Sequence, residues 1–189
     1  MSSLLRGIKE VSIHIGGVFA SREPTVVRTV LGSCVSACLF DPLTRIGGMN
    51  HFLLPEGDGD EGLPTRYGIH AMEVLINEVM KLGGERRRLH AKVFGGGHVL
   101  HMERGGMGVP ERNVFFIKQF LATEGIPILS QRLGGVHPLQ VYFFTHTARV
   151  LVKPLGKDTA KEVVVQEGRY KVEIARQLHH LPQDSVTLF

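Results

Sequence analysis

The chain has 189 residues, 43% of them hydrophobic, with 22 Lys and Arg against 18 Asp and Glu. This length is typical of a single domain, and the hydrophobic content is sufficient for a buried core, which excludes wholesale disorder. The basic residues are scattered and Trp is absent, so a nucleic-acid-binding surface is not expected. The tight basic run 86–88 is interpreted as a solvated charged loop, with contact to an acidic partner as the alternative.

No apolar stretch approaches the roughly 18 residues of a membrane span, and the first residues lack the apolar centre of a signal peptide. We therefore expect a cytoplasmic protein that does not insert into a membrane. A reducing compartment disfavours a structural disulfide between the two cysteines, Cys34 and Cys38. The cysteines are therefore interpreted as core residues or as reactive groups.

The first part of the chain is predicted to be rich in strands. Apolar and β-branched residues predict strands over 11–18, 25–31, 35–40 and 46–54. Between the last two, the segment DPLT (41–44) has the composition of a tight turn. The acidic, glycine-rich segment 56–64 is expected to be an exposed loop.

Two helices are predicted in the second part. From Ile69 to Leu82 apolar residues recur at spacings of three and four, and a Gly-Gly pair at 83–84 ends this helix. A second helix begins near Pro110, a residue type favoured in the first helical turn, and ends at Gly125.

Strand patterns resume between and after these helices. They are predicted at the start of HAKVFGGG (90–97), over 126–133, and in a hairpin of 139–144 with 149–153. An added edge strand is considered over 162–165, and the last residues are interpreted as either a frayed helix or a mobile tail.

Together these elements predict an α+β fold, a layered α/β sandwich of mostly antiparallel strands with two main helices. We expect a main domain over residues 1–155 and a partly flexible C-terminal extension over 156–189.

The predicted hairpin around 41–44 brings a cysteine and a histidine together. A two-residue turn would pair Leu39 with Ile46 and, further along, Cys34 with His51, whose Cβ atoms would then lie about 4.5–5.5 Å apart. A slip of one residue would send His51 to the other face. Cys38, about 13 Å from Cys34 along the strand, is expected to be a small buried hydrophobic residue.

A Cys beside a His is the minimal unit of thiol catalysis, because the imidazole favours the thiolate and later protonates the leaving group. Free backbone N–H groups around Gly32, Ser33 and Cys34 could stabilise an oxyanion. A third polar group should hold the imidazole. The candidates nearby in the sequence are Thr29, Ser33, Ser36 and Asn50.

The stretch LGSCVSACLFDPLTRIGGMNHFLLP (31–55) closely resembles the core motif of CheD, the chemoreceptor glutamine deamidase family of bacterial and archaeal chemotaxis. The likeness covers residues 8–153. It continues through RYGIHAMEVLINEVMKLGG, AKVFGGG, ERNVFFIKQFLATEGIPI and LGG. GSC, a His seventeen positions later, FGG and RNV, in this order, form a specific combination.

The resemblance implies an α/β sandwich similar to the catalytic domains of bacterial toxin deamidases. It implies Cys34 as the nucleophile, His51 as the general base and a threonine upstream of the Cys, here Thr29, as the third member. In the family pattern the threonine lies six positions before the Cys, where this chain has Arg28, whereas Thr29 lies five before it.

The activity implied by the resemblance is hydrolysis of receptor glutamine amides through a Cys–His thioester, with hydrolysis of glutamyl methyl esters as a related reaction. The family needs no metal or cofactor. The implied partners are the cytoplasmic helices of methyl-accepting chemotaxis receptors. Some family members also bind and stimulate a CheC-type phosphatase.

Two alternatives to this reading stay open. The chain could be an adaptor that binds and stimulates a CheC-type phosphatase with little catalysis of its own, or it could be a cysteine peptidase.

Two other sequence patterns are only weak evidence for a binding site. The triplet 95–97 lacks the Lys-Ser/Thr of a phosphate loop and is expected to be a tight loop near the active site. His98 and His101 have no third ligand at metal-binding spacing.

Overall fold

The computed structural model describes residues 7–54, 62–99 and 108–179. In these residues the strands are β1 (Lys9–Ser12), β2 (Val18–Ser21), β3 (Thr25–Leu31), β4 (Val35–Asp41), β5 (Ile46–Asn50), β6 (His90–Gly95), β7 (Ile128–Leu133), β8 (Leu139–Phe144) and β9 (Val150–Pro154). The helices are α1 (Gly62–Lys81), α2 (Val109–Thr123) and α3 (Lys157–His179), with a 3₁₀ turn, η1 (Arg86–Arg88).

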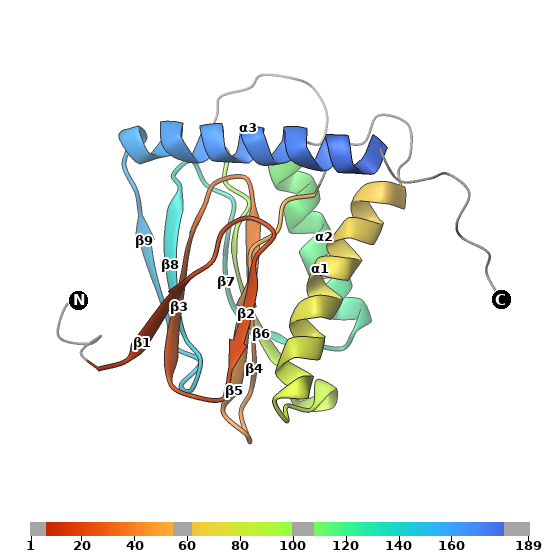
Figure 1. Ribbon diagram of the computed structural model, residues 1–189, viewed down its shortest axis with the longest axis vertical. Helices are drawn as coiled ribbons and strands as arrows, with labels where there is room; N and C mark the ends of the chain where they lie inside the picture. The colour runs from red at the N-terminus through yellow and green to blue at the C-terminus, as the bar shows by residue number, and fades with distance from the viewer. Residues whose placement is uncertain (1–6, 55–61, 100–107, 180–189) are drawn as a thin grey trace.

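The strands form two sheets that face each other. One has the order β1-β3-β8-β9 and the other β2-β5-β4-β6-β7. The pairs β1–β3 and β6–β7 are parallel, and the other neighbouring pairs are antiparallel. Helices α1 and α2 cover the outer side of the five-stranded sheet, and α3 crosses the ends of the sheets (Figure 1). The predicted α+β class is confirmed, but the helices number three in the described residues, and the sheets are mixed.

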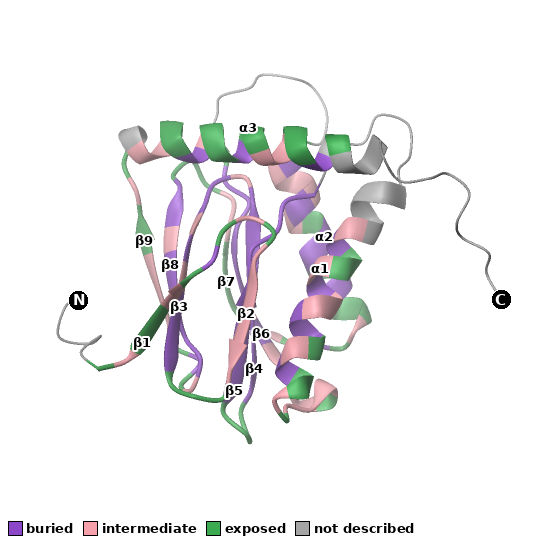
Figure 2. Cartoon of the chain, in the orientation of Figure 1, coloured by how far each residue is buried: buried purple, intermediate pink, exposed green. Residues whose placement is uncertain are grey.

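The five-stranded sheet lies between two cores. One core is shared with α1 and α2, and the other fills the space between the sheets. Strand β4 is buried along its whole length (Figure 2), which explains its nearly continuous apolar sequence. Cys38 belongs to the core between the sheets and has no exposed surface, so the prediction of a buried hydrophobic role is confirmed.

The turn between β4 and β5 is longer than predicted. Strand β4 ends at Asp41 and β5 begins at Ile46, so four residues connect them. The Asp41 carboxylate accepts hydrogen bonds from the backbone N–H groups of Leu43 and Thr44. Arg45 closes the turn in the left-handed region, at φ 58°.

This longer turn shifts the register of the hairpin by two residues. Leu39 pairs with Gly48 rather than with Ile46, and the same register continues beyond β5. The predicted direct pairing of Cys34 with His51 is therefore wrong. A shift of two leaves every side chain on its predicted face, so the two residues still lie on the same side of the sheet, on a diagonal.

Three other strand predictions need correction. The strand predicted over 11–18 is divided between β1 and β2, because a turn containing Gly16 at φ 81° separates them. The strand predicted over 46–54 ends at Asn50. The edge strand considered over 162–165 lies inside α3.

The basic run 86–88 is mostly structural rather than solvated. Arg86 forms an ion pair with Glu73, with 2.6 Å between Nη2 and Oε1. Arg88 pairs at 2.6 Å with Asp41, whose side chain is fully buried. Only the Arg87 side chain is largely exposed, at 82%, so the prediction of a solvated loop is wrong for its two neighbours.

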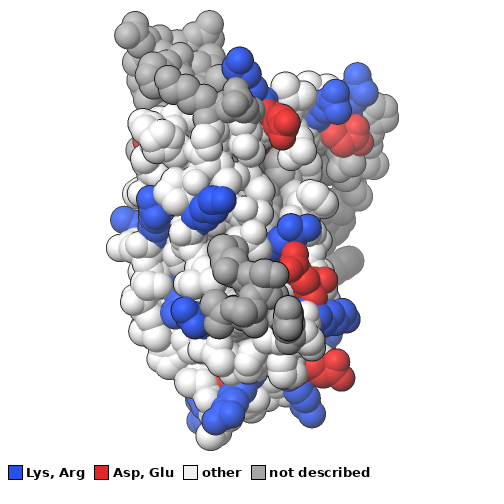
Figure 3. All heavy atoms as spheres, turned by 90° about the vertical axis from the view of Figure 1, so that its left-hand side faces the viewer, with Lys and Arg blue, Asp and Glu red and all other residues white. Residues whose placement is uncertain are grey.

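The surface and the helices agree with two other expectations. On the side of the molecule that Figure 3 presents, Lys and Arg side chains are spread out and interspersed with Asp and Glu. Among the described residues, every helix is too short or too polar to cross a bilayer.

Candidate active site

The GSC segment connects the two sheets, because it follows β3 of one sheet and precedes β4 of the other. The glycine loop after β6 holds it in place. Gly96 N–H donates to the carbonyl of Cys34, and Gly97 N–H donates to the carbonyl of Gly32, both at 2.7 Å. The loop at 95–97 is thus tightly packed against the GSC segment.

Gly95 is required where this loop begins. Its φ of +108° disfavours any residue with a side chain. A Cβ atom at this position would lie 2.2 Å from the carbonyl oxygen of Cys34. The loop can therefore approach the cysteine backbone this closely only with glycine here.

Asn113 fixes the GSC segment from a second direction. This residue near the start of α2 is completely buried. Its Nδ2 donates to the carbonyl of Ser33 at 2.9 Å, and its Oδ1 accepts from the N–H of Leu54 at 2.9 Å. Sequence reasoning quoted the RNV motif without giving Asn113 a role. An asparagine amid the apolar residues of a helix was the signal for a buried polar anchor.

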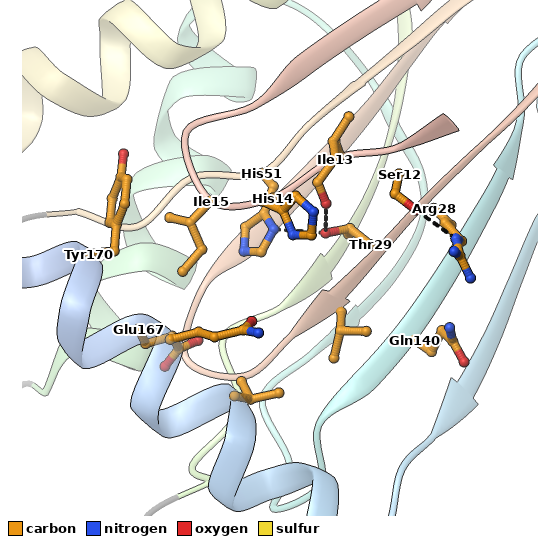
Figure 4. Close-up of a pocket in the computed structure, with 13 residues that line it drawn as sticks. Ser12, Ile13, His14, Ile15, Arg28, Thr29, His51, Gln140, Glu167 and Tyr170 are labelled. Atoms are coloured by element: carbon orange, nitrogen blue, oxygen red, sulfur yellow. Dashed lines mark hydrogen bonds between the residues drawn. The ribbon is translucent and has the colours of Figure 1, made fainter. Parts of the chain in front are cut away.

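Thr29 and His51 come from different sheets and meet in the space between them. The Thr29 hydroxyl lies 2.7 Å from Nδ1 of His51 and donates to the carbonyl of Ile13 at 2.9 Å (Figure 4). A hydroxyl has one proton to donate. Because that proton goes to Ile13, the hydroxyl accepts from Nδ1–H, and Nε2 of the neutral ring carries the free lone pair.

Strand alternation explains why Thr29, and not Arg28, reaches the histidine. The Arg28 side chain points the opposite way, where its Nε contacts Ser12 Oγ at 2.6 Å and Glu10 Oε1 at 2.8 Å. The threonine one position nearer to the cysteine therefore occupies the inward face of β3.

His51 is neutral at physiological pH. Burial, and secondarily the charge of His14, lowers its pKa from 6.5 to about 3. The side chain is only 4% exposed, and Nε2 is buried without a hydrogen-bond partner. The imidazole therefore presents an unoccupied base, and the structure shows no hydrogen bond between it and the Cys34 thiol.

Cys34 is fully buried, and its thiol is protonated in this conformation. Burial raises its pKa well above the ordinary value, and the negative charge of Glu167 and hydrogen bonding with it raise the pKa further. The Cys34 backbone N–H donates to Glu167 Oε1 at 3.2 Å, and Ser33 Oγ donates to Oε2 at 2.6 Å.

Sequence reasoning missed Glu167. The residue lies on α3, and its side chain is only 7% exposed. The signal was present in the helical spacing, since Val163, Tyr170 and Ile174 mark an apolar face that includes position 167. A carboxylate on that face needs buried donors, and the GSC segment provides them.

A cavity of about 490 Å³ opens beside His51 and Glu167, and Cys34 is not among the residues that line it. Thr29 and His51 line it from the strands, and Val163, Glu167 and Tyr170 line it from α3 (Figure 4). The cavity is large enough for a side chain of a substrate to enter.

The other candidates for the third group are engaged elsewhere. Ser36 Oγ donates to the carbonyl of Asn50, and Asn50 Oδ1 accepts from the N–H of Ala37.

The two histidines considered as metal ligands are His98 and His101. His98 Nε2 lies 3.0 Å from Glu111 Oε1, and His101 lies outside the described residues. Within the described part of the chain, no group of three His, Cys, Asp or Glu side chains could hold a metal ion.

Comparison with known proteins shows that this chain is similar to members of one family. The model of the family described as "CheD chemotactic sensory transduction" matches residues 53–154. A relative from Xanthomonas axonopodis pv. citri (strain 306) is 47% identical over 156 residues, covering 82% of this chain and 77% of the relative. A relative from Thiobacillus denitrificans is 49% identical over 161 residues, covering 82% and 78%. Both are described as "Probable chemoreceptor glutamine deamidase CheD".

A solved structure, described as the crystal structure of Bacillus licheniformis hypothetical protein YfiH, aligns with a TM-score of 0.39 and 14% identity over 63% of this chain and 49% of that one. The family match covers more than half of the chain, and the relatives are similar over most of it. The chain therefore belongs to the CheD family.

Proposed function

We propose that this protein is an amidohydrolase, a protein-glutamine glutaminase that deamidates glutamine side chains of methyl-accepting chemotaxis receptors. Family membership and the printed names of its relatives support this reaction. The observation that carries the proposal is the hydrogen bond between Thr29 and His51, which leaves a buried, unpartnered Nε2 on the same side of the sheet as Cys34.

In the first half of the proposed reaction, His51 Nε2 takes the proton of the Cys34 thiol, and the sulfur attacks the carboxamide carbon of the substrate. The backbone N–H of Cys34 donates to the developing oxyanion. Protonated His51 then gives its proton to the departing nitrogen, which leaves as ammonia. The carbonyl carbon remains bound to sulfur as a thioester.

In the second half, His51 removes a proton from water, and the resulting nucleophile attacks the thioester. The carbon–sulfur bond breaks, glutamate forms, and the thiol regains its proton. A glutamyl methyl ester can follow the same route, with methanol as the leaving group. Thr29 acts through His51 by keeping the proton on Nδ1, so it is a positioning residue.

We further propose that the protein works in the cytoplasm, where the receptor segments that carry these glutamines lie. We also propose that the fold resembles the catalytic domains of bacterial toxin deamidases, since the same nucleophile and base would serve both. Binding to a CheC-type phosphatase is a second candidate function. It rests on the family resemblance and does not require catalysis.

The test compares wild type with Cys34→Ala on a purified receptor cytoplasmic fragment, with peptide mass spectrometry to detect conversion of Gln to Glu. The matched control is Cys38→Ala, which removes the other buried thiol. We expect conversion and ammonia release with wild type and with Cys38→Ala, and neither with Cys34→Ala. New N-termini would indicate a peptidase. An unchanged receptor with wild type would favour the phosphatase-binding role.

A further inference from the structure

Helix α3 lies directly over the candidate nucleophile. It crosses the ends of the sheets, with its exposed residues on the outer side (Figures 1 and 2). Among the α3 side chains that the structure describes, Val163, Glu167 and Ile174 are buried, each less than 9% exposed, and the half-buried Tyr170 lies between Glu167 and Ile174. These residues are spaced as one face of a helix, and the only carboxylate among them is Glu167.

The carboxylate of Glu167 occupies the donors that a substrate amide would need. Its Oε1 accepts from the backbone N–H of Cys34, and its Oε2 accepts from the hydroxyl of Ser33. In the proposed reaction the Cys34 N–H binds the oxygen of the attacked carboxamide. Glu167 therefore has the position and the chemistry of the reaction product, a glutamate whose carboxylate has just formed beside the thiol.

The rest of the chain contacts this helix closely at two places. A Cβ atom at Gly32 would lie 2.7 Å from Val163 Cγ1 and 2.8 Å from Glu167 Oε1, so glycine is needed for this approach. At the second place, the hydroxyl of Tyr170 contacts the hydroxyl of Tyr67 on α1. Helix α3 is thus fitted closely over the site.

We propose that α3 is an internal competitor of the substrate, with Glu167 seated as a product mimic in the glutamine subsite, and that a receptor helix must displace it. This inference rests on the proposed function and specifies its substrate as a glutamine presented on an α-helix. By analogy with α3, apolar residues lie four positions before, three after and seven after the glutamine. While α3 is seated, the carboxylate disfavours the thiolate of Cys34.

The sharpest test converts the mimic into a substrate. Glu167→Gln is isosteric and places a carboxamide in the subsite. The Cys34 sulfur should bond to that carbon while the carbon–nitrogen bond breaks and ammonia leaves with the thiol proton. Water then cleaves the thioester and restores both Glu167 and the thiol. We expect peptide mass spectrometry of the purified variant to find Glu at position 167.

The control for this experiment is the double variant Glu167→Gln with Cys34→Ala, which should keep Gln at position 167. Conversion in both variants, or in neither, would overturn the proposal that Glu167 occupies the glutamine subsite. If position 167 is converted but the receptor fragment is not, the inference stands and the proposed receptor target fails. If the receptor is converted but position 167 is not, the proposed function stands and the inference fails.

A second measurement tests whether α3 and Glu167 suppress the reactivity of Cys34, and it does not depend on turnover. Iodoacetamide alkylation of Cys34 is followed by peptide mass spectrometry in wild type, in Glu167→Ala and in Glu162→Ala, whose side chain lies on an exposed part of α3. Loss of the Glu167 charge should accelerate labelling relative to both wild type and Glu162→Ala, because it lowers the pKa of the Cys34 thiol and so raises the thiolate fraction. Equal rates in all three would overturn the autoinhibitory role.

Discussion

The hydroxyl of Thr29 determines which nitrogen of His51 can act as a base. It donates to Ile13 and accepts from Nδ1, and this arrangement leaves the lone pair on Nε2. Such second-layer contacts keep a catalytic imidazole in one tautomer and one orientation. The family resemblance placed a threonine near this site, and strand alternation explains how Thr29 reaches it from a position one residue away from the family pattern.

Replacing Thr29 with Val removes the hydroxyl and keeps the shape of the side chain. We expect kcat for receptor deamidation to fall about 10- to 100-fold, the usual effect of losing a group that orients a reactive ligand, with little change in KM. Thr29→Ser should restore most of the rate. A parallel rise in KM, or equal losses in the Val and Ser variants, would contradict the positioning role. Initial rates over a range of receptor fragment concentrations provide the measurement.

His51 makes stability depend on pH, because its pKa is lowered from 6.5 to about 3 in the folded protein. The unfolded chain therefore binds a proton below about pH 6.5 that the folded chain does not accept. The contribution of the neutral His51 to the free energy of unfolding should be fully present above pH 6.5, and it should be lost progressively as the pH drops toward 3. Urea midpoints at pH 7 and pH 4.5 should differ less in His51→Gln than in wild type. If the midpoint changes equally with pH in both proteins, His51 is not a source of the pH dependence of stability.

At the scale of the elements, the turn after β4 combines two structural roles. Asp41 caps the turn that sets the hairpin register, and its buried carboxylate also pairs with the partly exposed Arg88 of η1. Burial opposes its ionisation, but the hydrogen bonds from Arg88 and from backbone N–H groups outweigh burial and hold the Asp41 pKa below its ordinary value. One carboxylate therefore joins the hairpin to the segment that precedes β6.

Asp41→Ala should lower the free energy of unfolding by about 2 kcal/mol, because it leaves the backbone N–H groups of Leu43 and Thr44 without their acceptor and removes one of the two carboxylates that pair with Arg88. The control is Arg87→Ala in the same basic run, where the side chain is 82% exposed and little change is expected. Urea denaturation of both variants provides the comparison. A loss below 1 kcal/mol for Asp41→Ala would show that solvent or a rearranged turn replaces the pair.

Helix α3 shows why some elements could not be predicted from sequence patterns. Its first part contains three consecutive valines, 163–165, which favour a strand by intrinsic propensity. Only one of them, Val163, is buried, while Val165 is 52% exposed. The spacing that includes Tyr170 and Ile174 follows a helix, and tertiary packing over the GSC segment outweighs the local preference of the valines.

At the scale of the whole molecule, local patterns located most strands and two helices, because periodicity and turn residues are encoded within short segments. The pairing of the strands could not be predicted from such local patterns. Strand β3 pairs with β8, more than a hundred residues later in the chain. The residues of the GSC motif were recognisable as a group, whereas Asn113 and Glu167 join the site only through these distant contacts.

The meeting of Thr29 and His51 across the two sheets has a consequence for how the protein tolerates mutation. Their hydrogen bond of 2.7 Å spans two layers whose separation depends on the side chains packed between them. A substitution in that core that thickens or tilts the layers by a fraction of an ångström would break the contact while the chain remains folded. If the proposed reaction is correct, substitutions of the apolar residues between the sheets should therefore lower the reaction rate before they lower stability.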